Sequence, residues 1–320
     1  MKQFLLVSII AMSLSLNAFS QKDTVEVPDS LDGRNWKLQS IFGANGTQAS
    51  FVNWNAGGRN NISLLAYVNA QANWAKGKST WENSLNVALG GLQYIGKGSG
   101  DATLQKTDDK IELSSIYGRK LSNYFYNSFF VSAKTQALDG FASPNDSVRV
   151  STFLAPGYLN FGLGIDYKPS KHLSIFLSPV SAKMTIVNDQ VLANSGSFGV
   201  TPAVYDTSGF VVENGKRFRG EFGAYFKVIY DKEIAKNINM RGTLDLFSNY
   251  LDRPENIDVN SDLLFTFKVN SWFSASINWT LKYDHDINIR DSQGGFGPRT
   301  QFKSVLGLGI SYKMKNTKDK

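Results

Sequence analysis

Residues Tyr158–Leu177, with the sequence YLNFGLGIDYKPSKHLSIFL, contain two alternating runs separated by a turn. From Leu159 to Tyr167 every second residue is apolar, whereas the residues between them, such as Asn160 and Asp166, are polar or glycine. Successive side chains of a strand point to opposite faces, so each run is predicted to form a strand with one apolar and one polar face. Residues 169–172 have turn chemistry and join the two runs into a β-hairpin.

Most of the chain repeats this pattern. Nearly all of the predicted strands are longer than the roughly 5–6 residues of a soluble strand, and most fit the roughly 9–11 residues that cross a bilayer at a tilt. The twelve predicted strands are 36–46, 61–75, 79–94, 109–118, 123–136, 158–168, 172–187, 217–230, 237–249, 257–269, 272–284 and 301–313.

The connections between these strands alternate in length, as the turns and loops of bacterial outer-membrane barrels do. The short ones are 76–78, 119–122, 169–171, 231–236 and 270–271, and the long ones are 47–60, 95–108, 137–157, 188–216, 250–256 and 285–300. Aromatic residues near strand ends suit the girdles of such a barrel and argue against a soluble sandwich: Trp74, Trp81, Tyr167, Tyr230, Phe273, Tyr283 and Tyr312. We therefore predict an all-β, transmembrane, up-and-down antiparallel β-barrel of about 12 strands, with long extracellular loops and short periplasmic turns.

The N-terminal residues have the pattern of a secretory signal. A short basic start precedes an apolar run from Phe4 to Leu16, and small residues Ala18 and Ser20 follow it. We predict a cleaved signal peptide at 1–20, a flexible periplasmic segment at 21–35, the barrel at 36–313 and a basic periplasmic tail at 314–320. This organisation predicts secretion through the inner membrane and a location in the cell outer membrane.

Composition excludes several classes of protein. The chain has no cysteine, so disulfides, thiol catalysis and an acylated N-terminal cysteine are excluded. Outside the N-terminus no apolar run reaches the roughly 18 residues that a membrane helix needs. The net charge is +7, but the basic residues are scattered, and no partner nucleic acid is predicted.

Charged residues fall on the inward positions of the predicted strands, nine of them basic and seven acidic. This near balance favours ion pairs that narrow the lumen over strong charge selection. Four of these residues, Arg219, Glu221, Arg241 and Asp245, are expected to form one cross-strand network that constricts the path. The candidate lumen-lining residues are Glu82, Lys110, Glu112, Asp166, Arg219, Glu221, Lys227, Arg241, Asp245, Asp258, Asp262, Lys268 and Lys282.

Two motifs are candidates for a catalytic or metal-binding site. His172 and Ser174 form an H-x-S triplet, the spacing that twelve-stranded outer-membrane phospholipases use, but no partner Asn can be placed and the pair lies by a short turn. Asp284-His285-Asp286 has carboxylates at alternating positions, although its spacing matches no calcium loop. We predict no enzyme activity, no catalytic or metal-binding residue and no cofactor.

The segment Phe51–Asn60 contains the pattern W-x-x-G-G-x-N, with Trp54, Gly57, Gly58 and Asn60. Together with four further segments it resembles the family of domains of unknown function 3078, which is typical of Bacteroidota. The resemblance covers nearly the whole mature chain, implies an outer-membrane location and supplies no enzyme assignment and no catalytic residues. The further segments are 106–113, 144–148, 153–158 and 246–251.

The sequence therefore predicts a narrow channel for small polar solutes. The alternative is a non-transporting scaffold or subunit of an envelope assembly that contacts partners through its outer loops, which loops on a rigid scaffold often do. Expected partners are outer-membrane lipid, the barrel-assembly machinery and, for the alternative, another envelope protein.

Overall fold

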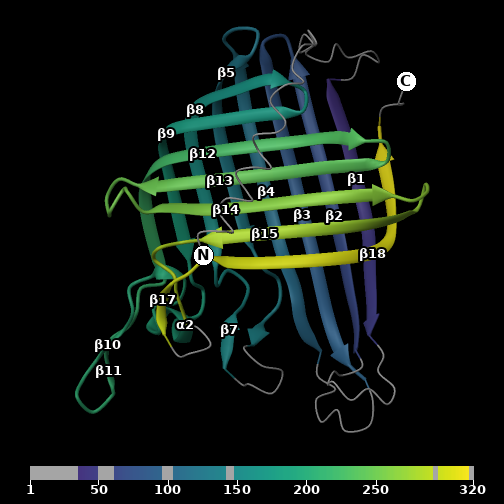
Figure 1. The fold of residues 1–320 in the computed structure, drawn as a ribbon. Helices are drawn as coiled ribbons and strands as arrows, with labels where there is room; N and C mark the ends of the chain where they lie inside the picture. Colours follow the sequence, from purple (N-terminus) through teal and green to yellow (C-terminus); the bar gives the residue numbers. More distant parts are fainter. Residues whose placement is uncertain (1–34, 50–60, 96–103, 142–147, 291–294, 317–320) are drawn as a thin grey trace, which may run out of the picture.

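In a computed structural model, the chain forms a closed barrel of antiparallel strands (Figure 1). The structure describes residues 35–49, 61–95, 104–141, 148–290 and 295–316. The predicted signal peptide and the motif residues Trp54, Gly57, Gly58 and Asn60 lie outside these ranges. Within them the barrel has twelve strands: β1 (Trp36–Ala49), β2 (Asn61–Lys76), β3 (Ser79–Tyr94), β4 (Gln105–Lys120), β5 (Phe125–Thr135), β8 (Gly157–Ser170), β9 (Leu173–Ile186), β12 (Phe218–Ala235), β13 (Ile238–Asn249), β14 (Ile257–Lys268), β15 (Phe273–Tyr283) and β18 (Gln301–Lys315).

Each barrel strand pairs with the strand before and after it in sequence, and β1 pairs with β18 to close the ring. The predicted fold class, strand number and alternation of short and long connections are confirmed. We call the two ends of the barrel the short-turn end and the long-loop end. Strand β18 continues two residues beyond the predicted barrel boundary at 313.

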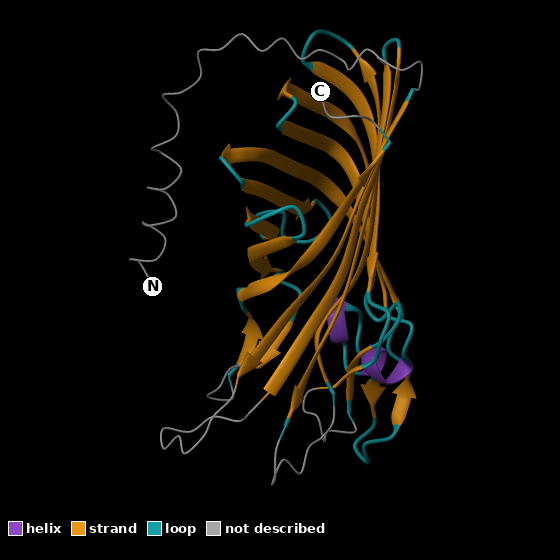
Figure 2. Ribbon diagram, turned by 90° about the vertical axis from the view of Figure 1, so that its right-hand side faces the viewer, coloured by secondary structure: helices purple, strands orange, loops and turns teal. Residues whose placement is uncertain are grey.

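The long connections carry the remaining elements. Among the described helices, none has the length and apolarity needed to cross a membrane. Figure 2 shows the two helical segments gathered at one end of the barrel, which is the long-loop end. These elements are β6 (Gly140–Phe141), β7 (Arg149–Ser151), α2 (Gln190–Asn194), η1 (Ser197–Gly199), β10 (Val204–Tyr205), β11 (Val211–Glu213), β16 (Asn288–Arg290) and β17 (Phe296–Pro298).

Alternation along the strands separates an apolar outer face from an inner face. In β8, Leu163 is 57% exposed, whereas Asp166, on the opposite face, is 0% exposed. The hairpin partner β9 does the same, with Leu177 exposed and Ser178 buried. The outer face therefore offers apolar side chains to its surroundings, and the polar groups that lipid cannot solvate point inward.

The two sides of the barrel approach each other closely. In Figure 1, strands β12–β15 of one wall run across β2–β4 of the opposite wall. Inside, the rings of Phe130 on β5 and Tyr225 on β12 stack with their centroids 5.1 Å apart, although these strands are not neighbours in the sheet. Side chains from both walls therefore meet in the middle and form a buried core. Its members are Ile116, Phe130, Phe176, Tyr225 and Phe247.

The seam between β1 and β18 is shorter than the other strand pairings. Residues Gln39–Gly46 of β1 pair with β18, whereas β2 and β3 pair over the whole of Asn61–Lys76. Asn45 of β1 reaches past β18 to β15, where its Nδ2 lies 3.4 Å from Ser276 Oγ. Glycine is needed beside it, because a Cβ at Gly309 would lie 2.1 Å from the backbone oxygen of Ala44.

Gly309→Ala is expected to weaken barrel closure, because the added methyl group has no space between β18 and β1. Overpacking of this kind costs roughly 1–3 kcal/mol. The measurement is a urea titration in detergent, followed by the gel mobility of unheated protein. Gly242→Ala in β13 is the matched control, since the nearest atom to its Cβ would be 3.4 Å away. Equal unfolding midpoints for the two variants would contradict a tight seam.

Candidate functional site

The lumen is the candidate functional site, and its two sides differ. Toward β5, β8, β9 and β12 the inward side chains are buried, with Phe130, Phe176 and Ser178 at 0–1% exposure. Toward β1, β2, β15 and β18 the inward positions are mostly partly exposed and carry amide and hydroxyl groups. We call these the packed side and the polar side. Residues typical of the polar side are Asn69, Gln71, Asn86, Asn278 and Thr280.

A paired charge lies against the aromatic core of the packed side. Lys227 Nζ donates a 2.7 Å hydrogen bond to Asp245 Oδ1, and the ammonium group lies 5.6 Å from the centroid of the Phe130 ring. The same carboxylate accepts hydrogen bonds from Tyr225 Oη at 2.5 Å and from Asn260 Nδ2 at 3.2 Å. Both carboxylate oxygens of Asp245 accept hydrogen bonds, and its buried negative charge is compensated by Lys227. The aromatic core around the pair can therefore remain packed.

A larger charge network lines the long-loop end of the packed side. Lys183 Nζ on β9 forms ion pairs with Asp258 on β14 at 2.6 Å, with Asp284 at 3.3 Å and with Glu221 on β12 at 3.5 Å. Arg219 extends it, with Nη2 at 3.2 Å from Glu221 and 2.5 Å from Asp286. Since β9 is a neighbour of neither β14 nor β15 in the sheet, the pairs of Lys183 with Asp258 and Asp284 tie one part of the wall to another across the mouth.

The connection from β9 to β12 packs onto this network. Arg219 Nη1 donates a 3.0 Å hydrogen bond to the backbone oxygen of Gly199 in η1. A small apolar cluster fixes the connection, and α2 is capped by Asp189, whose Oδ1 accepts hydrogen bonds from the backbone nitrogens of Val191 and Leu192 at 2.9 and 3.0 Å. The long loop is therefore anchored at the rim of the lumen. The cluster consists of Ala155, Val187, Leu192, Ala193 and Val200, with Phe198 packed against it.

At the short-turn end another ion pair links separated strands. Lys168 on β8 pairs with Glu82 on β3, which is three strands away, and with Asp166 at 3.1 Å. Ser174 Oγ donates a 2.7 Å hydrogen bond to Asp166 Oδ1. Nearby, Arg241 lies 3.6 Å from Asp231 on the adjacent strand. Lys268 is exposed at the end of β14.

Lysines from β4, β5, β15 and β18 gather near the long-loop end of the lumen. Lys282 on β15 lies close enough to Lys134, Lys303 and Lys110 for their positive charges to repel one another. Lys110 pairs with Glu112 at 3.3 Å, and Lys303 pairs with an acidic side chain of β4, Asp108, at 2.9 Å. In the described part of the chain, neither Lys134 nor Lys282 takes part in an ion pair. Asp262 Oδ1 accepts a 2.6 Å hydrogen bond from Thr280 Oγ1.

The expected network of Arg219, Glu221, Arg241 and Asp245 is wrong. The register of β12 and β13 places Asp231 opposite Arg241 and Lys227 opposite Asp245. Arg219 lies twelve residues from Asp231 along β12, a separation of about 40 Å at the usual rise per strand residue. The four residues therefore belong to three separate clusters, because Arg219 and Glu221 lie at the start of β12, whereas Arg241 lies near the turn at the other end of the hairpin.

Sequence reasoning missed the partners that complete these clusters. Sequence reasoning did not place three charged residues in the lumen, namely Lys168, Asp284 and Asp286. It also predicted a turn at Asp231. The aromatic core was missed as well, although its signal was present: Phe176 lies between Ile175 and Leu177 of the outward face, so alternation alone points it inward.

The two candidate chemical motifs have structural contacts. His172 Nδ1 lies 2.8 Å from the backbone oxygen of Asp231. The Ser174 hydroxyl donates its hydrogen bond to Asp166 rather than to the histidine. Asp284 forms an ion pair with Lys183, and Asp286 forms one with Arg219. Among the residues that the structure describes, no group of three or more His, Cys, Asp or Glu could hold a metal ion.

Two family profiles match parts of the chain. Residues 47–141 match the family described as "Protein of unknown function (DUF3078)", which confirms the resemblance for this part of the sequence. Residues 197–292 match "Protein of unknown function, DUF481". The comparison with curated proteins gave no match.

Several solved barrels are similar to this chain. The translocator domain of the autotransporter NalP from Neisseria meningitidis is 9% identical, with 88% of this chain and 90% of that chain covered and a TM-score of 0.33. An outer membrane channel from Pseudomonas putida F1 is 10% identical, with coverages of 92% and 99% and a TM-score of 0.37. The toluene transporter TodX from P. putida is 13% identical, with coverages of 88% and 79% and a TM-score of 0.30. All three similarities are remote, so they assign no activity to this chain.

The order of the anchored loop is expected to depend on the charge of Asp189. Hydrogen bonds from the backbone of Leu192 and Val191, together with Arg149, hold the pKa of this carboxyl below its usual value. A lowered pKa means that the charged form stabilises the loop above the ordinary pKa of about 3.9, and that this stability is lost as the pH falls through the lowered value. Hydrogen exchange of residues 187–217, followed by mass spectrometry between about pH 2 and 6, should show protection decreasing at the acid end.

Asp189→Asn should remove this acid step, because the amide oxygen still accepts the capping bonds but does not titrate. Asp252→Asn, in the connection after β13, is the control and should leave the step in place. An unchanged acid step in Asp189→Asn would show that another group governs the loop.

Proposed function

We propose that the protein spans an outer membrane and acts as a narrow channel for small polar solutes, with a preference for anions. The outer face of the barrel carries apolar side chains that suit a lipid environment, and the inner face carries amides, hydroxyls and charges. A twelve-stranded barrel is intermediate between small filled barrels and wide porins. The proposal places the solute path on the polar side of the lumen.

The observation that carries the proposal is the lysine cluster near the long-loop end of the lumen. Lys282 points inward from β15 and is nevertheless exposed, so solvent reaches the lumen at this level. Lys134 projects from β5, on the other side of the ring of strands, and the two ammonium groups repel each other. Positive charges held close together outside ion pairs attract mobile anions, and rings of one charge sign set the selectivity of a pore.

The packed side limits the size of the solute. The aromatic core and the Lys227–Asp245 pair fill the space between the walls, and the network around Lys183 narrows the mouth on the same side. A path confined to the remaining part of the lumen admits small solutes and excludes large ones. Conductance below that of a wide porin follows from this geometry.

Replacing both lysines, as Lys134→Gln with Lys282→Gln, should shift ion selectivity toward cations. The physical reason is that the remaining carboxylates of Glu112 and Asp262 then dominate the local field. Reversal potentials in planar bilayers under a potassium chloride gradient measure the effect, and wild type should favour chloride by a factor of a few. The preference should reverse or disappear in the double variant.

Lys268→Gln is the matched control, because this inward lysine is exposed at the opposite end of the lumen. It should change the reversal potential less than the double variant does. Identical selectivity of wild type and the double variant, or a wild type without measurable conductance, would remove the support for an anion path.

A second candidate function, a scaffold that binds another envelope protein, is favoured by the hairpin formed by β10 and β11. This hairpin extends from the long-loop end and exposes a set of apolar side chains that monomeric proteins rarely leave in water (Figure 1). A scaffold role predicts co-purification of a defined partner that is lost in a Phe210→Ser, Val212→Ser variant, with conductance unchanged. The exposed residues are Val204, Tyr205, Phe210, Val211 and Val212.

A further inference from the structure

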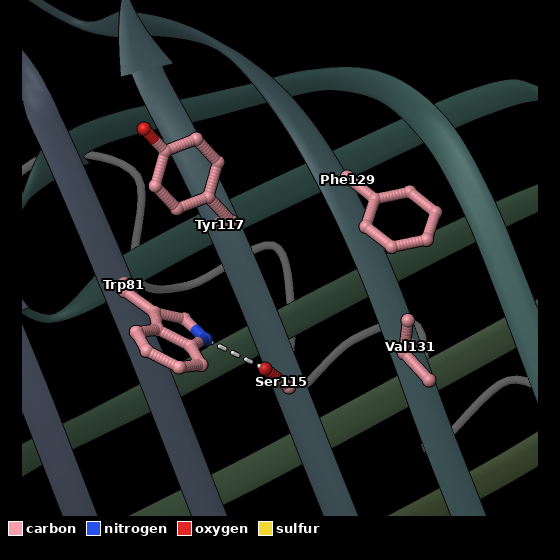
Figure 3. A pocket seen from close by; sticks show the side chains of 5 residues that line it. All are labelled: Trp81, Ser115, Tyr117, Phe129 and Val131. Carbon is pink, nitrogen blue, oxygen red and sulfur yellow. Dashed lines mark hydrogen bonds between the residues drawn. The ribbon is translucent and has the colours of Figure 1, made fainter.

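The outer face of the barrel has a groove at the short-turn end. Figure 3 shows its five lining side chains, which come from the adjacent strands β3, β4 and β5. The groove has a volume of about 370 Å³, and its exposed lining is almost entirely apolar. Because these residues lie on the face that points away from the lumen, the groove opens toward the surrounding lipid. The lining residues are Trp81, Ser115, Tyr117, Phe129 and Val131.

The polar groups in the groove are satisfied within the wall. Trp81 Nε1 donates a 2.8 Å hydrogen bond to Ser115 Oγ, which donates in turn to Asn83 Oδ1 at 2.8 Å. Asn83 Nδ2 completes the chain with a 3.1 Å bond to the backbone oxygen of Ala72. Unpaired polar groups are costly in lipid, so these hydrogen bonds make the groove compatible with an apolar occupant. They also fix the orientation of the Trp81 indole beside the groove.

Basic side chains lie directly beside the groove at the rim of the barrel. Arg119 follows Tyr117 on the same face of β4 and is exposed, and it pairs in register with Ser79 and Asn127 on the flanking strands. Lys78 is exposed in the adjacent turn. Within the described part of the chain, neither Arg119 nor Lys78 forms an ion pair. The rim therefore has positive charge available for an external anion.

Positive charge is concentrated at the whole short-turn end. The residues 76–79, 119–124, 168–172, 231–237 and 268–272 contain nine lysines or arginines and two acidic residues, Asp231 and Glu233. Both acidic residues lie near the end of β12, beside the turn to β13. The turns beside the groove contain only basic charge, so the groove is the place where an apolar surface meets uncompensated positive charge.

We propose that this groove binds one anionic phospholipid, with an acyl chain along Trp81, Phe129 and Val131 and the headgroup phosphate at Arg119 and Lys78. The inference rests on the proposed membrane location but not on channel activity. The fork of an arginine matches phosphate geometry, and an exposed lysine adds a second positive charge. Trp81 and Tyr117 lie at the level where aromatic rings of membrane proteins meet lipid headgroups.

The headgroup decides the selectivity of this site. An acyl chain leaves an equally apolar bilayer when it enters the groove, so its contacts supply shape fit and little net hydrophobic gain. A basic residue near a membrane surface attracts anionic lipid by about five-fold in affinity. Two such residues should favour an anionic over a zwitterionic phospholipid by roughly 25-fold.

Native mass spectrometry of the folded, detergent-solubilised protein tests the proposal, with dioleoyl phosphatidylglycerol and dioleoyl phosphatidylcholine titrated separately. Wild type should retain one phosphatidylglycerol at concentrations where it retains no phosphatidylcholine. Arg119→Gln with Lys78→Gln should weaken phosphatidylglycerol retention by roughly 25-fold. Val131→Trp should also weaken it, because the larger ring fills the groove without changing the charge.

Lys232→Gln with Lys236→Gln is the matched control, since it removes two charges from the end of β12 and the turn that follows it, at the same end of the barrel. It should leave retention within a factor of two of wild type. Equal losses in the two double variants would show general attraction to a basic surface and overturn the site. Unchanged retention in Val131→Trp, or equal retention of both lipids by wild type, would overturn it as well.

Gel mobility of unheated protein shows in each case whether the variant has folded. Lys78→Gln alone, a change confined to an exposed turn residue, replaces any double variant that fails this check and should weaken retention about five-fold. Bilayer conductance is measured on the same proteins. Loss of lipid retention with unchanged conductance separates the outcome for this site from the outcome for the channel.

Discussion

The structure depends on closure of the sheet, because lipid offers no hydrogen bonds to the polar groups of an open strand edge. Here the closing contact is the short seam between β1 and β18, where Gly309 allows the backbones to approach and Asn45 reaches across to β15. Every other strand pairs with its sequence neighbour, so only this seam joins segments from opposite ends of the chain. The hairpins can form locally, but the inner and outer faces become distinct only when the seam forms.

The two walls of the closed barrel cross each other, so the lumen is packed in one part and accessible in another. Where the walls meet, aromatic rings and compensated charges such as Lys227–Asp245 form a core that braces the barrel. Elsewhere inward amides and lysines remain accessible, and Lys134 and Lys282 repel each other and form no ion pair with any residue that the structure describes. The side that braces the barrel and the side proposed for the solute path are therefore different, which explains how a chain with nearly balanced inward charges can still hold a local excess of one sign.

The ends of the barrel differ as well. The short-turn end is basic and includes the apolar groove beside Arg119, whereas the long-loop end holds the acidic residues that anchor Lys183 and Arg219. Exposed charge at a membrane surface selects lipid headgroups, while charge inside a narrow mouth selects solutes. In the proposed functions, the same residue types therefore act on different partners according to which face of the strand they occupy.

Sequence alone determined the barrel class, the twelve strands, the alternation of turns and loops and the alternation of two faces along the strands, because strand periodicity and turn chemistry are local properties of the chain. It also identified Arg219, Glu221, Asp258 and Lys282 as inward charges. Their partners were decided only by tertiary structure, since register and the approach of the two walls depend on residues far apart in sequence. Periodicity says which face a residue occupies, but not at what height it lies or what stands opposite, so the groove beside Trp81 and the separation of Arg219 from Arg241 became visible only in the closed barrel.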